Sequence, residues 1–357
     1  MLILGIDTSC DDTSAAIVKD GSFVLSNIVS SQTEIHRQFG GVVPEVAARS
    51  HIELIIPVIK QALQEANIKK EELDLIAVTN GPGLITSLMV GIDTAKSLAY
   101  SLNKKIIAIN HIEGHIYSNW LVQKNNFRIS EFPLSAEAKQ SEAKAENFQF
   151  PILCLIVSGG HTELIYMKDH LNYNVIGQTR DDAAGEAFDK VAKLLDIGYP
   201  GGPIISKLAE SGDDQAYNFS RPMINSKDFD FSFSGLKTEV LRLTKENNIF
   251  SKQQINDICA SFQKAVVDTL IFKTINAAKK YNVKTIMLGG GVSANKSLRK
   301  NLEQKIQQEI PDSHFSILNS QFSSDNGAMI ASTAYQYAKN NKFSDFSKII
   351  PEANLSL

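Results

Sequence analysis

The chain has 357 residues and a formal net charge of −3, so it lacks the strong basic excess that is typical of nucleic-acid-binding domains. Its length favours two lobes, because a single hydrophobic core tends to stop growing at roughly 250–300 residues. No apolar run reaches the roughly 20 residues of a membrane-spanning helix, and three widely spaced cysteines exclude a disulfide framework and favour a reducing cytoplasm.

The first part of the chain predicts strands and helices in alternation. Residues 2–7 are apolar and predict a strand, without the basic segment of a signal peptide. After a polar turn, the expected elements are strands at 14–18 and 22–30, a helix at 44–66, a strand at 73–79, a helix at 85–102 and a strand at 105–110. This last strand should bring His111 to the start of a further helix.

The opening pattern of strand, small polar turn and strand restarts near Pro151. The expected elements are strands at 152–157, 163–167 and 173–179, helices at about 184–196, 203–211, 235–246 and 252–281, a strand at 284–288, and helices at 292–306 and 325–340. This repeat predicts two α/β lobes, at 1–125 and 150–324, with the helix at 325–340 packing back near the cleft between them. Residues 126–149, rich in Ala, Glu, Lys and Ser, are expected to form a solvated linker or insertion.

His111 and His115 stand four residues apart and would share one face of a helix. Imidazole is the commonest metal ligand, and a carboxylate from elsewhere, such as Asp325, would complete a 2-His-1-carboxylate set. Zincin proteases instead carry a glutamate directly after the first histidine. Here Ile112 takes that place, and Glu113 would point about 200° away from His111. The spacing therefore indicates a metal site without a protease base, although two partly exposed surface histidines explain the spacing alone equally well.

Three turns of small residues follow apolar strands, at 7–13, 158–162 and 289–295. Glycine lets a backbone approach a ligand closely, and runs of free N–H groups bind anions. One such turn is weak evidence, but three of them split across two lobes favour a nucleotide held in a cleft. None matches the P-loop or Rossmann pattern.

Two further positions stand out in the second half. Asp189 lies between apolar neighbours on a predicted helix, so we expect it to be either paired or functional. Gly202, in the rigid turn 199–203, could pass close to a ligand. A purely structural role explains each of them equally well. Glu186 and Lys190 are spaced as an ordinary helical surface pair.

Ten segments together resemble one family over nearly the whole chain. They are GIDTSCDDTSAA, GGVVPEVAAR, GPGL, HIEGH, VSGGHTEL, DDAAGEAFDKVAKLL, YPGGP, FSFSGLKT, GGGVSAN and SDNGAMIA. Their order and rough spacing resemble the universal tRNA threonylcarbamoyladenosine transferases. Other proteins of the actin, sugar-kinase and heat-shock ATPase fold lack the HIEGH pair and the DDAAGEAFDK segment, so the resemblance is specific. The sequence departs from the family pattern at residues 128–147, a segment that is longer than the compact form of the family requires.

The resemblance implies a two-lobed, ribonuclease-H-like α/β fold with a nucleotide in the cleft. It implies transfer of threonylcarbamoyl from threonylcarbamoyl-AMP to the N6-amine of the adenosine 3′ of the anticodon, in tRNAs that read codons beginning with A. One divalent metal, iron most of all with zinc as the alternative, would be held by His111, His115 and Asp325. The implied substrate contacts are Ile156, Val157, Ser158, Gly159, Gly160, Asp189, Gly202 and Asn295.

The reaction needs a base that accepts the proton of the attacking amine. Our hypothesis is that Asp11 or Asp12 is this base. Either carboxylate also suits a role in shaping the turn. The resemblance further implies tRNA as substrate, and a same-fold paralogue (TsaB-type) and a P-loop ATPase (TsaE-type) as partners, in the cytoplasm and without a membrane. Two alternatives remain. An ATP-dependent sugar- or acetate-type kinase of the same fold leaves the histidine pair unexplained, and a non-catalytic partner subunit would be expected to lose the metal ligands.

Overall fold

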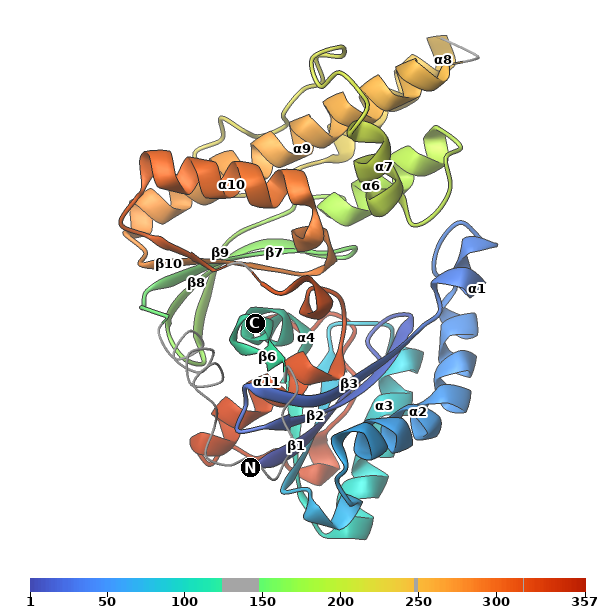
Figure 1. The fold of residues 1–357 in the computed structure, drawn as a ribbon, viewed down its shortest axis with the longest axis vertical. Helices are drawn as coiled ribbons and strands as arrows, with labels where there is room; N and C mark the ends of the chain where they lie inside the picture. The colour runs from blue at the N-terminus through green and yellow to red at the C-terminus, as the bar shows by residue number, and fades with distance from the viewer. Residues whose placement is uncertain (124–147, 247–249, 317) are drawn as a thin grey trace. The chain divides into compact units, whose positions relative to one another are not determined.

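The structure is a computed structural model that describes residues 1–123, 148–246, 250–316 and 318–357. The chain divides into two compact units (Figure 1). Unit 1 comprises Met1–Glu34, Val42–Phe148 and Ser324–Leu357, and unit 2 comprises Ile35–Gly41 and Gln149–Ser323. The insertion expected at 128–147 lies outside the described residues. Within the described part of the chain, no helix combines the length and the apolar character that crossing a membrane demands.

Unit 1 is built on a six-stranded sheet with the order β5-β4-β1-β2-β3-β6. The strands are β1 (Leu2–Asp7), β2 (Asp12–Lys19), β3 (Phe23–Ser31), β4 (Leu75–Gly81), β5 (Lys105–Asn110) and β6 (Val122–Gln123). The first three form an antiparallel meander, whereas β4 pairs in parallel with β1 and with β5. The meander and the parallel crossovers therefore meet at β1, whose C-terminal end carries the first polar turn.

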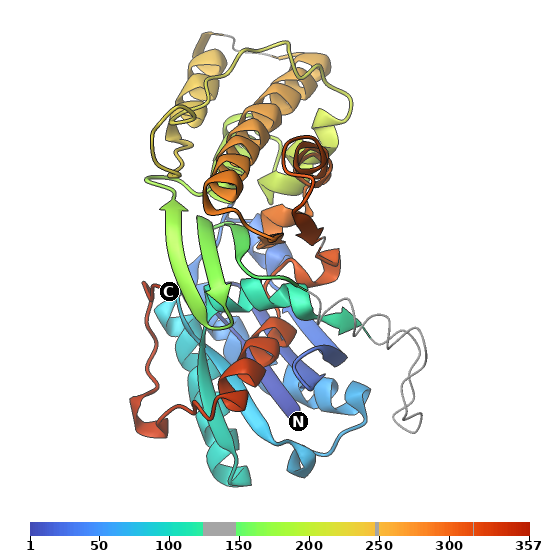
Figure 2. The same ribbon diagram turned by 90° about the vertical axis from the view of Figure 1, so that its left-hand side faces the viewer.

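Helices cover both faces of this sheet (Figures 1 and 2). On one face α2 (Pro44–Ala66) and α3 (Ile85–Leu102) share a core with the side chains of Leu4 and Ile6. Side chains alternate along a strand, so Gly5 faces the other side. There a Cβ atom on Gly5 would collide with the carbonyl oxygen of Gly327 in α11 (Gly327–Lys339). The lack of a side chain on Gly5 thus lets α11 lie close against β1.

Unit 2 repeats this topology with a five-stranded sheet in the order β11-β10-β7-β8-β9. Its strands are β7 (Ile152–Val157), β8 (Thr162–Asp169), β9 (Asn172–Gln178), β10 (Thr285–Gly289) and β11 (His314–Ser316). Again the first three strands form an antiparallel meander, and the later strands add in parallel. The same arrangement in both units is what the restart near Pro151 indicated.

The helices of unit 2 supply most of its core. They are α6 (Ala184–Leu194), α7 (Gly201–Ala209), α8 (Ser234–Glu246), α9 (Lys252–Tyr281) and α10 (Lys296–Glu309). Helix α9 starts with a capping box in which Ser251 and Gln254 bond each other's backbone N–H groups. In the core, Phe188 of α6 meets Phe262 of α9 edge to face, with ring centroids 5.2 Å apart.

Two helices start later than the sequence predicts. The helix expected from residue 292 begins at Lys296, because a 3₁₀ turn, Gly291–Ala294, comes first and Asn295 caps α10. The helix expected from residue 325 begins at Gly327, because the side chain of Asn326 accepts a hydrogen bond from the N–H of Met329. Asp325 therefore lies just outside α11. The short α1 (Thr33–Arg37), β6 and β11 were not predicted.

Candidate functional site

The two histidines lie on one face of a short helix, α4 (His111–Tyr117), directly after β5. The side chain of Asn110 caps this helix by accepting a hydrogen bond from the N–H of Ile112, at 2.8 Å. The imidazole rings of His111 and His115 meet edge to face with centroids 4.6 Å apart. They are 5% and 0% exposed, so the interpretation as surface histidines is wrong.

Asp325 approaches this pair from the other end of the sequence. Its Oδ1 atom lies 3.4 Å from Nε2 of His111 and 3.3 Å from Nε2 of His115. The three ligand atoms all lie within 4.8 Å of one another. The structure thus brings together the three residues that were expected to hold a metal, and all three belong to unit 1.

The donor set fits a divalent metal. Both ring nitrogens of His115 are buried without a hydrogen-bond partner among the described residues, which is costly for an imidazole that binds nothing. Ligand atoms held about 2.1 Å from one ion at tetrahedral angles are roughly 3.4 Å apart, close to the separations found here. The other ring nitrogen of His111, Nδ1, lies 3.6 Å from Oδ1 of Asp7. In metal sites a carboxylate commonly orients a metal-bound imidazole through this second nitrogen.

The electrostatics of the metal-free group favour one bound proton. Burial opposes charge on His111, but the carboxylates of Asp325 and Asp7 outweigh it and raise its pKa to about 10. Burial also disfavours a charged Asp325, yet the two histidines hold its pKa well below the usual range. Burial, with the neighbouring His111 charge, lowers the pKa of His115. The metal-free site is therefore a His111–Asp325 ion pair beside a neutral His115.

Glu113 plays no part in this donor set. Its carboxylate is 4% exposed and accepts two hydrogen bonds from the hydroxyl of Tyr337 on α11, at 2.9 and 3.0 Å. The acid of the HIEGH segment is thus engaged by a neighbouring helix rather than placed as the base of a protease.

The polar turn after β1 carries the two candidate bases. Asp12 opens β2, and its Oδ1 atom is buried without a hydrogen-bond partner in the described part of the chain. Burial, reinforced by the charge of Asp325, raises the pKa of Asp12 to about 7. The neighbouring Asp11 is half-buried. Asp12 can therefore exchange a proton near neutral pH.

His51 of α2 holds this turn in place. Its Nε2 atom lies 3.0 Å from the carbonyl oxygen of Cys10, and its Nδ1 atom lies 2.7 Å from the hydroxyl of Thr13. One tautomer satisfies both contacts, with Nε2–H donating to Cys10 and Nδ1 accepting from Thr13. The sequence analysis did not identify His51, because no local pattern links it to the turn.

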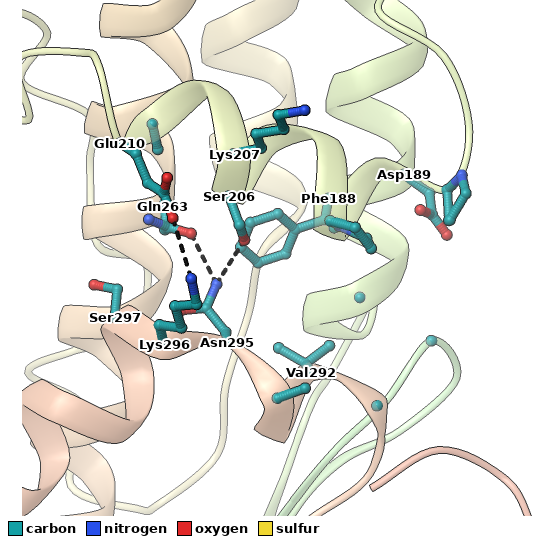
Figure 3. A pocket seen from close by; sticks show the side chains of 18 of the residues that line it. Phe188, Asp189, Ser206, Lys207, Glu210, Gln263, Val292, Asn295, Lys296 and Ser297 are labelled. Carbon is teal, nitrogen blue, oxygen red and sulfur yellow. Dashed lines mark hydrogen bonds and ion pairs between the residues drawn. The ribbon is translucent and has the colours of Figure 1, made fainter. Parts of the chain in front are cut away.

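Unit 2 contains a pocket of about 930 Å³ between α6, α7, α9 and the start of α10 (Figure 3). Four of the eight expected substrate contacts line it: Gly159, Asp189, Gly202 and Asn295. The other four lie elsewhere, because Ile156 and Val157 are fully buried within β7 and Ser158 and Gly160 lie in the turn that follows.

The glycines of the pocket keep its wall open. A Cβ atom added at Gly159, Gly202 or Gly291 would meet no other atom within 4 Å. Gly290 serves the turn itself, because its φ of 84° is unfavourable for other residues and a Cβ there would collide with the carbonyl oxygen of Val157. The glycine turns at 158–162 and 289–295 thus both contribute backbone to one pocket, as a ligand held by main-chain groups would require.

Asn295 and Asp189 are both hydrogen-bonded within the protein, and Figure 3 shows the bonds of Asn295 to Ser206 and Gln263. The side-chain amide of Asn295 donates to Ser206 of α7 at 2.9 Å and to Gln263 of α9 at 2.8 Å, while its oxygen accepts from Leu298 at 3.0 Å. Asp189 accepts a hydrogen bond from the N–H of Gly201 at 2.7 Å. Asn295 therefore has no amide hydrogen left for a ligand, and both side chains brace the wall of the pocket.

Three lysines lie at the pocket, a position that the sequence did not predict for them. Lys207, Lys296 and Lys300 line it. Lys296 and Glu210 form an ion pair at 3.5 Å, drawn as a dashed line in Figure 3. Lysines on helices are usually solvated, so sequence alone offered no sign that these three gather at one pocket.

Comparison with known proteins finds relatives over most of the chain. The family model described as "TsaD: tRNA N6-adenosine threonylcarbamoyltransferase" matches residues 23–138 and 129–332. A protein of that name from Staphylococcus haemolyticus is 48% identical over 94% of this chain and 91% of its own. Another, from Thermosipho africanus, is 47% identical over 97% of each chain.

Solved structures confirm the fold class. HypF from T. kodakarensis superimposes with a TM-score of 0.59 at 14% identity, covering 95% of this chain and 48% of that one. The activator of the 2-hydroxyisocaproyl-CoA dehydratase from Clostridium difficile gives a TM-score of 0.52 at 14% identity, covering 96% and 97%. These likenesses support the predicted ribonuclease-H-like α/β fold. The sequence relatives establish more, and the chain belongs to the tRNA N6-adenosine threonylcarbamoyltransferase family, whose members modify tRNA by forming threonylcarbamoyladenosine.

Proposed function

We propose that this tRNA-modifying transferase takes threonylcarbamoyl from threonylcarbamoyl-AMP and delivers it to the N6-amine of the adenosine 3′ of the anticodon, in tRNAs that read codons beginning with A. We propose further that it works with one divalent metal, iron first with zinc as the alternative. The observation that carries the proposal is the convergence of His111, His115 and Asp325 on one point. The kinase and the non-catalytic subunit receive no support from the curated relatives, which are transferases.

The pocket of unit 2 is our candidate for the adenylate site. Its volume of about 930 Å³ falls within the range of ligand pockets. Lys207, Lys296 and Lys300 supply positive charge for a phosphate, and the open glycines Gly159 and Gly202 expose main chain to it. Two proteins of the same fold were solved with nucleotides, the dehydratase activator with ADPNP and HypF in a phosphate- and nucleotide-bound form.

The reaction requires that the two substrates be positioned and that a base accept a proton. Threonylcarbamoyl-AMP is a mixed anhydride with a good leaving group, but the adenosine amine is a weak nucleophile, so its orientation and the loss of its proton limit the rate. A divalent metal, when bound, supplies a Lewis acid that stabilises negative charge on the attacked carbonyl group. Asp12 is our candidate base, because burial brings the pKa of its carboxyl to about 7. Asp11 then serves to shape the turn.

The proposal includes a same-fold paralogue and a P-loop ATPase as partners, in the cytoplasm. Ile52 and Ile56 of α2 share a helix face and are 64% and 46% exposed. Adjacent exposed apolar side chains of this size favour a protein contact. A helical face on unit 1 thus offers a place for a partner subunit.

The test is a transfer assay with synthetic threonylcarbamoyl-AMP, tRNA and the two partner proteins, followed by nucleoside analysis and measurement of bound metal. His111→Ala and His115→Ala should lose metal and abolish modification, because each removes a ligand. His314→Ala, which alters an exposed histidine of β11, is the matched control and should keep full activity. Full activity and full metal content in both α4 variants would reject the metal site.

A further inference from the structure

Glu113 lies between the two metal-binding histidines and has no role in the proposed reaction. Its carboxylate is 4% exposed, and burying a carboxylate is costly unless hydrogen bonds compensate. The hydroxyl of Tyr337 contacts both of its oxygens, at 2.9 and 3.0 Å. A buried carboxylate held in this way joins α4 to α11.

Other contacts bring the same two helices close together. Gly114 faces α11, and a Cβ atom there would lie 3.0 Å from Ile330 and 3.1 Å from Met329, tighter than ordinary packing. One turn further on, the hydroxyl of Ser332 donates to the carbonyl oxygen of Tyr117, at 3.3 Å. The residues of α11 that make these contacts all precede Tyr337, so the Glu113 hydrogen bond adds a further contact toward the C-terminal end of α11. A change in that bond therefore acts on a closely packed interface.

This interface relates the two halves of the metal site. His111 and His115 project from α4, whereas Asp325 directly precedes Asn326, the residue that caps α11. Helices move as rigid bodies, so the offset between α4 and α11 sets the distance from the two Nε2 atoms to the carboxylate of Asp325. A shift of about 1 Å in that offset would move the ligand atoms out of the geometry that a metal site requires.

We infer that Glu113 and Tyr337 are positioning residues, which fix the separation between the histidine pair and Asp325; this inference rests on the proposed metal site. It explains why the segment is His-Ile-Glu-Gly-His. The two histidines bind the metal, the glycine admits α11, and the glutamate bonds to it. Outer groups of this kind typically contribute 10–100-fold to metal affinity.

The test measures Zn²⁺ affinity of the purified chain by competition with a chelator, together with thermal unfolding of the metal-free protein. Tyr337→Phe removes only the hydroxyl and should weaken Zn²⁺ binding by about tenfold. Glu113→Gln should retain most of the affinity, because the amide oxygen can still accept from Tyr337, whereas Glu113→Ala should lose as much as Tyr337→Phe. Tyr335→Phe, two residues away on α11, is the matched control and should bind as the native chain does.

The outcomes separate this inference from the proposed function. Loss of Zn²⁺ binding in His111→Ala with unchanged affinity in Tyr337→Phe and Glu113→Ala overturns the positioning role and leaves the metal site standing. A lower unfolding temperature with unchanged affinity also overturns it, because the pair would then serve stability alone. Equal losses in Glu113→Gln and Glu113→Ala would assign the effect to charge and contradict the hydrogen bond as its cause. Retained binding in His111→Ala rejects the metal site itself.

Discussion

The carboxylate of Asp189 accepts a hydrogen bond from the backbone N–H of Gly201, at 2.7 Å. Gly201 is buried at the start of α7, and its neighbour Gly202 lines the pocket of unit 2. Asp189 therefore holds the turn that forms one wall, and its effect on a ligand passes through the backbone of that turn.

Asp189→Ala should consequently lower both stability and nucleotide affinity. The variant leaves the buried N–H of Gly201 without its acceptor, which costs about 1–3 kcal/mol of unfolding free energy. Asp189→Asn should be much milder, because the amide oxygen can accept the same hydrogen bond. Urea unfolding and calorimetric titration with AMP measure the two effects. If Asp189→Asn lost affinity as fully as Asp189→Ala while remaining stable, a direct charge contact with the ligand would replace the bracing role.

Much of this architecture was predictable because its strands and helices carry local periodicity. The bounds of β5, α2 and α3 agree with the apolar pattern of the sequence. The same local reasoning placed His111 and His115 on one helix face. Spacing within a helix is a short-range property, so these predictions needed no knowledge of the tertiary fold.

The partners of those residues come from distant parts of the chain, and periodicity does not reveal them. Asp325 reaches the histidines because α11 packs against β1, which depends on the missing side chain of Gly5. Likewise the amide of Asn295 is occupied by Ser206 and Gln263, from two other helices. The motifs therefore predicted which residues lie together at the metal group and at the pocket, but not whether their hydrogen-bonding groups are free for a ligand.

Metal binding should release one proton from His111. In the metal-free protein the pKa of His111 is raised to about 10, so it is protonated at pH 8, whereas the pKa of His115 is lowered and that ring is neutral. A metal requires both imidazoles neutral. The apparent affinity should therefore rise roughly tenfold per pH unit between about pH 8 and 9.

Calorimetric titration with Zn²⁺ in two buffers of different ionisation enthalpy measures the number of protons released. The range above pH 8 avoids the titration of Asp12, whose pKa is about 7. His111→Ala serves as the blank for non-specific binding. Affinity that does not change between pH 8 and 9, with no proton released, would contradict the assignment of the proton to His111.

Asp12→Asn should slow threonylcarbamoyl transfer while leaving donor affinity unchanged. A base must be ionised to accept a proton, and burial raises the pKa of Asp12 to about 7, so the native rate should rise as pH increases through that value. A bound cation would favour the ionised carboxylate and should move this rise to lower pH. The loss should be about 10²–10⁴-fold, as for other general bases. Single-turnover rates across pH 5–9 provide the measurement.

Asp11→Asn is the matched comparison, because it alters the neighbouring carboxylate of the same turn. It should keep the pH profile of the native enzyme even if the rate falls modestly. The reverse pattern, with the rise in rate abolished in Asp11→Asn and kept in Asp12→Asn, would move the base to Asp11. Loss of donor affinity alone in both variants would remove the base role from this turn.

Two adjacent glycines offer a direct test of where the adenylate binds. Gly159 lines the pocket of unit 2 and Gly160 does not, yet a Cβ atom at either position meets nothing within 4 Å. Neither substitution by alanine should change the unfolding free energy by more than about 0.5 kcal/mol. If the adenylate occupies the pocket, the methyl group of Gly159→Ala should cost about 1–3 kcal/mol of AMP-binding free energy, the usual penalty for overpacking. Gly160→Ala should bind AMP normally. Equal affinity in the two variants would place the nucleotide elsewhere, because a ligand in this pocket cannot approach the backbone of Gly159 without meeting the added carbon.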